Sequence, residues 1–81
     1  MNTGEHLTLI IELINQNRSP DALAQSLERL LTPVEIKTIG TRLQILALLE
    51  EGLPQREIAA RLGVGIATVT RGSKELQAQR T

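Results

Sequence analysis

Residues 54–71, PQREIAARLGVGIATVTR, decide the fold class of this 81-residue chain. Two stretches with helical spacing of apolar residues flank a glycine-containing break, so the predicted order is helix, tight turn, helix. Gly63 suits the turn because glycine adopts positive φ without steric cost, and the small Ala59 lets the two helices approach closely. This spacing is typical of a helix-turn-helix. Four apolar residues are expected to hold the angle between the helices: Ile58, Leu62, Val64 and Val69.

The second helix of this motif carries small side chains that suit the major groove of DNA. At its N-terminal end Ile66, Ala67 and Thr68 would face base edges or thymine methyl groups, and the hydroxyl of Thr70 makes little sense in a core. Arg61 fits a phosphate contact or a solvated surface equally well. The predicted DNA-binding residues are Arg56, Ile66, Ala67, Thr68, Thr70 and Lys74, of which Arg56 and Lys74 are assigned to phosphates. The alternative is a generic helical hairpin used to dock another protein.

Upstream of residue 54 the sequence predicts three more helices and no strand. Apolar spacing indicates a first helix over about residues 5–16, and Ser19-Pro20 predicts the N-cap and first turn of a second helix. Thr32-Pro33-Val34-Glu35 is a capping box that opens a third helix, which extends to about Glu51 before Gly52. The fold class is therefore all-α, with about five helices.

These upstream helices hold more apolar residues than one buried stripe needs. The first helix is apolar on more than one face, and the third carries apolar residues around most of its circumference, as a central buried helix would. A second copy of the chain is the expected cover, so we predict a homodimer. We expect one domain over residues 1–81, with a dimerisation core over residues 5–51 and a DNA-reading part over residues 54–79.

Composition excludes several classes of function. The chain has no Cys, Phe, Tyr or Trp and one His, so thiol chemistry and aromatic stacking on single-stranded bases are excluded, and a two-His metal site would need ligands from two copies of the chain. We therefore do not expect an enzyme. Nine basic residues balance nine acidic ones, but residues 41–81 hold six basic against four acidic residues, which is compatible with phosphate contacts. The sequence shows no membrane span or basic signal segment, so we expect no membrane partner and a cytoplasmic protein.

Four segments of the chain resemble the trp repressor family: LLTP at 30–33, IGTR at 39–42, PQREIA at 54–59 and LGVGIATVTRGSKEL at 62–76. The resemblance implies an intertwined all-helical homodimer that binds L-tryptophan as corepressor and has no other cofactor. The ligand orients the reading helices onto a palindromic double-stranded DNA operator, which controls genes for tryptophan synthesis or uptake. This docking geometry, including base contacts made through water, is implied by the family and does not follow from the spacing of residues.

The same resemblance implies the corepressor-binding residues. Arg42 and Arg71 match two arginines whose flat guanidinium groups sandwich the indole, and Arg71 also holds the ligand carboxylate with help from Thr32. The alternative role of Arg42 and Arg71 is in a pair of surface salt bridges. Gly72 would leave room for the ligand. The complete predicted set is Leu30, Leu31, Thr32, Arg42, Arg71, Gly72 and Glu75, with backbone carbonyls around Leu30 and Leu31 of the other subunit receiving the ammonium.

Two departures from the family pattern bear on these expectations. Glu75 stands where the family has a serine near the ammonium, so it would pair with a cation, crowd the pocket or change the ligand. The family's C-terminal helix is absent, which implies either a larger interface role for the N-terminal helix or a truncated or diverged member. A DNA-binding protein with a different ligand or no ligand is therefore an alternative, beside the protein-interaction module.

Overall fold

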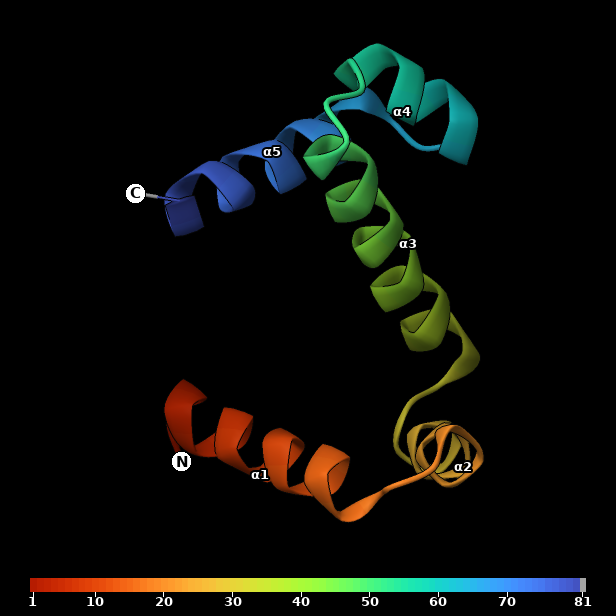
Figure 1. Ribbon diagram of the computed structural model, residues 1–81, viewed down its shortest axis with the longest axis vertical. Helices are drawn as coiled ribbons and strands as arrows, with labels where there is room; N and C mark the ends of the chain where they lie inside the picture. The colour runs from red at the N-terminus through yellow and green to blue at the C-terminus, as the bar shows by residue number, and fades with distance from the viewer. Residues whose placement is uncertain (81) are drawn as a thin grey trace. The chain divides into compact units, whose positions relative to one another are not determined.

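The computed structural model describes the backbone of residues 1–80 and the side chains of residues 1–78. Those residues form five helices and no strand: α1 (Thr3–Gln16), α2 (Pro20–Leu30), α3 (Pro33–Glu50), α4 (Gln55–Leu62) and α5 (Ile66–Arg80) (Figure 1). The all-α prediction is confirmed. Within the described part of the chain, none of these helices is both long enough and apolar enough to cross a membrane. The chain divides into two compact units, residues 1–36 and a second unit that begins at Lys37.

The helices of the first unit begin at side-chain caps. The Ser19 hydroxyl accepts a hydrogen bond from the backbone N–H of Ala22 at 3.1 Å, with Pro20 in the first turn of α2 as predicted. Helix α1 starts two residues before its predicted position because the Asn2 side chain accepts from the Glu5 N–H at 2.8 Å, in a capping box that apolar spacing does not reveal. Side-chain caps therefore define both helix starts.

The first unit leaves its apolar side chains open to solvent. No residue among 1–36, all of which the structure describes, is buried, and five large apolar residues of α1 are exposed. The exposed large apolar residues of α1 are Leu7, Leu9, Ile10, Ile11 and Ile14.

Helix α3 differs from the expectation of a central buried helix, because Leu43 is 61% exposed and Ile45 is the residue of α3 that is buried.

The second unit has a small core where α4 and α5 meet α3 (Figure 1). Ile45 of α3, Ile58 of α4 and Val69 of α5 are its buried residues. Six partly buried apolar residues surround them, so the predicted packing of the helix-turn-helix is confirmed. The surrounding residues are Leu48, Leu49, Leu53, Ala59, Leu62 and Val64.

Two glycines with positive φ follow α3 and α4. Gly52 (φ 85°) follows α3, and the N–H groups of Gly52 and Leu53 donate to the carbonyls of Leu49 and Leu48 in the two bonds of a Schellman motif. Gly63 (φ 67°) ends α4 in the left-handed region, as predicted for the turn of the motif. These turns direct α4 back toward α5.

Candidate functional site

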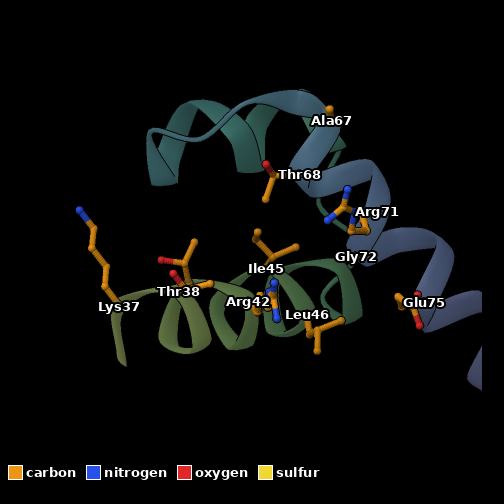
Figure 2. Close-up of a pocket in the computed structure, with 11 residues that line it drawn as sticks. Lys37, Thr38, Arg42, Ile45, Leu46, Ala67, Thr68, Arg71, Gly72 and Glu75 are labelled. Atoms are coloured by element: carbon orange, nitrogen blue, oxygen red, sulfur yellow. The ribbon is translucent and has the colours of Figure 1, made fainter. Parts of the chain in front are cut away.

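A pocket of about 640 Å³ lies between α3 and α5 in the second unit. Its volume falls in the range of about 300–1,000 Å³ that is usual for small-molecule sites. Figure 2 shows Ile45 and Thr68 facing each other from the two helices, with Lys37 near one end and Glu75 near the other. The lining residues are Lys37, Thr38, Thr41, Arg42, Ile45, Leu46, Ala67, Thr68, Arg71, Gly72 and Glu75.

Two arginines from different helices line this pocket. Arg42 comes from α3 and Arg71 from α5, and both are exposed. Among the residues whose side chains the structure describes, neither forms a salt bridge, whereas Arg61 pairs with Glu57 at 3.2 Å. The alternative role of Arg42 and Arg71 in surface salt bridges is therefore not seen. Their planar, charged head groups remain available to a ligand.

Gly72 allows α5 to approach α3 closely. A Cβ built at this position would lie 2.9 Å from Cγ2 of Ile45 and 3.6 Å from Cδ1 of Leu49. The space for a side chain is therefore filled by the core, and the expectation that the missing side chain leaves room for a ligand needs correction. Gly72 contributes to the pocket by bringing the two walls together.

The other predicted corepressor residues divide between the two units. Glu75 lines the pocket from α5. Leu30, Leu31 and Thr32 belong to the first unit and are not among the lining residues. The Thr32 hydroxyl accepts from the Glu35 N–H at 3.1 Å, and the Glu35 carboxylate accepts from the Thr32 N–H at 2.9 Å, as the capping box predicts. These two bonds hold the pKa of Glu35 below its ordinary value.

The predicted DNA-binding residues lie on α4 and α5. Ile66, Ala67 and Thr68 are exposed at the N-terminal end of α5, and Arg56 and Lys74 are also exposed. Ala67 and Thr68 line the pocket as well. Two residues expected to meet DNA, both in the first turn of α5, therefore also line the pocket.

Thr70 differs from its expected place on a groove-facing surface. It is half-buried, and its Oγ1 lies 2.7 Å from Oε1 of Gln55 and 3.0 Å from the carbonyl oxygen of Ile66. A hydroxyl has one proton, so both contacts are satisfied together when the Gln55 amide is turned over to donate to Thr70. The bond joins the start of α4 to α5. Sequence reasoning missed Gln55, and its polar side chain directly after Pro54 was the available signal.

The family of the chain follows from a match along almost all of its length. The model of the Trp repressor protein matches residues 5–81. The chain belongs to the Trp repressor family. This is a family of regulatory DNA-binding proteins and not of enzymes. Within the part of the chain that the structure describes, no cluster of three or more His, Asp or Glu side chains has the arrangement of a metal site.

Several relatives in this family cover most of the chain. A Trp operon repressor homolog of Vibrio parahaemolyticus is 44% identical over 71 residues, which are 86% of this chain and 69% of the relative. A homolog of Actinobacillus succinogenes is 40% identical over 74 residues, covering 90% of this chain and 73% of the relative. A homolog of Mannheimia succiniciproducens is 55% identical over 49 residues, or 59% of this chain and 48% of the relative.

Proposed function

We propose that this Trp repressor family member is a homodimeric transcriptional repressor that binds double-stranded DNA when L-tryptophan occupies the pocket between α3 and α5. The relatives named as Trp operon repressor homologs support genes of tryptophan metabolism as its targets. The observation that carries the proposal is that one turn of α5 serves both surfaces. Ala67 and Thr68 line the pocket and also lie at the exposed start of the reading helix.

The chemistry of the pocket suits a flat aromatic amino acid. Arg42 and Arg71 offer guanidinium planes that stack on an aromatic ring, and the Arg71 guanidinium also pairs with a carboxylate. Ile45 and Leu46 supply apolar contacts on the α3 side. A ligand that touches both walls stabilises one spacing of α5 from α3. It thereby acts on the orientation of the reading helix and favours the DNA-binding conformation by its differential affinity.

On DNA, the exposed first turn of α5 is the part that enters the major groove. Ile66, Ala67 and Thr68 contact base edges, while Arg56 and Lys74 contact phosphates on either side. Thr70 acts through its bond to Gln55, which sets the angle of α5 against α4, and not through a base contact. The roles of Leu30, Leu31 and Thr32 at the ligand remain predictions of the family resemblance.

The homodimer is proposed because the first unit does not bury its own apolar side chains. Five large apolar residues of α1 are exposed, and Leu7 and Ile11 are 52% and 54% accessible. Monomeric proteins seldom expose contiguous apolar patches to water, and α1 carries these five residues within two to three turns. A second copy of the chain supplies a matching surface. Sedimentation equilibrium at micromolar concentration is expected to give the mass of a dimer, and a monomer mass would contradict this part of the proposal.

Ligand binding is tested by titrating the protein into L-tryptophan and following the emission and anisotropy of the ligand. The chain has no Trp, Tyr or Phe, so its own emission does not interfere. We expect saturable binding that is lost in Arg42→Ala and Arg71→Ala. Arg61→Ala is the matched control, because Arg61 is an exposed arginine outside the pocket. Absence of any change at high protein concentration would refute L-tryptophan as the ligand.

DNA binding is tested by selection from a random duplex pool at fixed salt, with and without L-tryptophan. We expect palindromic duplexes to be enriched when the ligand is present, and Thr68→Val to alter the enriched sequence while Lys74→Ala weakens binding to all sequences. A selected duplex that binds no better than random DNA at moderate salt would favour a protein-interaction module instead. Enrichment that does not depend on L-tryptophan would favour a DNA-binding protein with another ligand or none.

A further inference from the structure

Among the lining residues of the pocket, one is acidic. Glu75 lies at the end of the pocket opposite Lys37 (Figure 2), and the other charged lining residues are Lys37, Arg42 and Arg71. The pocket therefore presents positive charge along most of its length and a single carboxylate at one end. A ligand that matches this pattern carries an anionic group beside a cationic one.

Arg71 and Glu75 are spaced to pair with each other but do not. They lie one turn apart on α5, at the i and i+4 positions where side chains are neighbours. Among the side chains that the structure describes, this pair forms no salt bridge, although Glu57 and Arg61, at the same spacing on α4, are 3.2 Å apart. The sequence order contributes to the difference, because an acidic residue before a basic one is the more favourable arrangement on a helix. Within residues 1–78, both head groups on α5 are thus left without an ionic partner.

We infer that Arg71 and Glu75 together select an α-amino acid, with the ligand carboxylate on Arg71 and the ligand ammonium on Glu75. The inference rests on the proposed function and deepens it, because it makes Glu75 a residue that determines ligand specificity. In an α-amino acid the two charged groups are attached to one carbon, so the ligand bridges two helix positions one turn apart. The same ligand without its amino group would still pair its carboxylate with Arg71, but it would bring that carboxylate near Glu75 with no ammonium to neutralise the Glu75 charge.

The test compares L-tryptophan with 3-indolepropionate, which has the same ring and carboxylate but no amino group. Both ligands fluoresce, so one titration format gives both dissociation constants on the whole protein. The variant is Glu75→Gln, which keeps the size of the side chain and removes its charge. Glu51→Gln is the matched control, because Glu51 is an exposed glutamate that does not line the pocket.

For the wild-type protein we expect L-tryptophan to bind about tenfold more tightly than 3-indolepropionate, in line with a charge-assisted hydrogen bond at an exposed site. In Glu75→Gln we expect about a tenfold loss of affinity for L-tryptophan for the same reason. The affinity for 3-indolepropionate is expected to stay unchanged or rise, so the ratio of the two constants falls toward one. A change in fold stability alone would move both constants in the same direction.

Three results would overturn the inference. Equal loss of affinity for both ligands would make Glu75 a structural residue, and tighter binding of L-tryptophan by Glu75→Gln would mean that Glu75 crowds the pocket. Two dissociation constants that both stay at their wild-type values would make it a bystander. In these cases L-tryptophan still binds and the proposed function stands, whereas a wild-type protein that binds neither ligand refutes L-tryptophan as the corepressor and removes the basis of the inference.

Discussion

Replacing Gly72 with alanine is expected to destabilise the second unit by forcing α5 away from α3. The new Cβ would lie 2.9 Å from Cγ2 of Ile45, closer than non-bonded carbon atoms approach in proteins. Ile45 is 2% exposed and β-branched, so its χ1 angle has little freedom to move the methyl group away. Overpacking of this kind costs about 1–3 kcal/mol. Alanine in place of a helical glycine returns about 1 kcal/mol, so we expect a net loss of up to about 2 kcal/mol.

Urea unfolding followed by circular dichroism measures this difference, and in a domain of this size about 1 kcal/mol lowers Tm by roughly 4–8 °C. Gly40→Ala is the control, because Gly40 is also helical in the second unit and a Cβ there meets nothing within 4 Å in this chain. It should stabilise by up to about 1 kcal/mol. Ile45→Leu removes the clashing branch, so the loss caused by Gly72→Ala should be smaller in that background. If Gly72→Ala stabilises the protein as Gly40→Ala does, the close approach of the two helices is refuted.

Two further predictions concern hydrogen bonds in the two units. Thr70→Val removes the bond to Gln55 and is expected to lower the free energy of unfolding in urea by about 0.5–1.5 kcal/mol. Thr68→Val is the control, because Thr68 is exposed, and it should cost little. Equal losses for the two variants would argue against the bond between α4 and α5. The lowered pKa of Glu35 means that its ionised form is favoured by folding, so its contribution to stability is present above the ordinary glutamate pKa and is lost as pH falls through the lower folded value. Glu35→Gln should therefore reduce stability near neutral pH, and its Tm should fall less steeply than that of the wild type as the pH is lowered. A variant whose Tm falls with pH as steeply as that of the wild type would contradict this role.

Local features of the fold were predictable because their causes are local. The start of α2 depends on Ser19 and Pro20, and the start of α3 depends on the two bonds between Thr32 and Glu35, so a few neighbouring residues suffice to place them. The turn at Gly63 was likewise predictable from one residue type at one offset. The start of α1 was not predicted correctly, because apolar spacing begins only after the cap at Asn2.

Features that depend on residues far apart in the chain were harder to predict from the sequence. Thr70 looks like a surface residue in sequence, and its bond to a side chain 15 positions away appears only when α4 and α5 are packed. Gly72 suggests an open space, but its contact with Ile45 shows that the space is occupied. In both cases the residue type marked a position of interest, but the residue that contacts it in the folded chain could not be predicted from the sequence.

The sequence by itself determined the five helices and the helix-turn-helix, because helix caps and glycine turns depend on a few neighbouring residues. It also excluded thiol chemistry, because that follows from composition and needs no geometry. The tertiary structure decided which side chains share a pocket. Arg42 and Arg71 come from helices separated by the whole of α4, and they line one pocket because the packing of Ile45 against Gly72 brings α3 and α5 together. Among the side chains that the structure describes, Arg71 and Glu75 line that pocket without pairing with each other, although their spacing on α5 allows a pair, so spacing alone did not decide this feature.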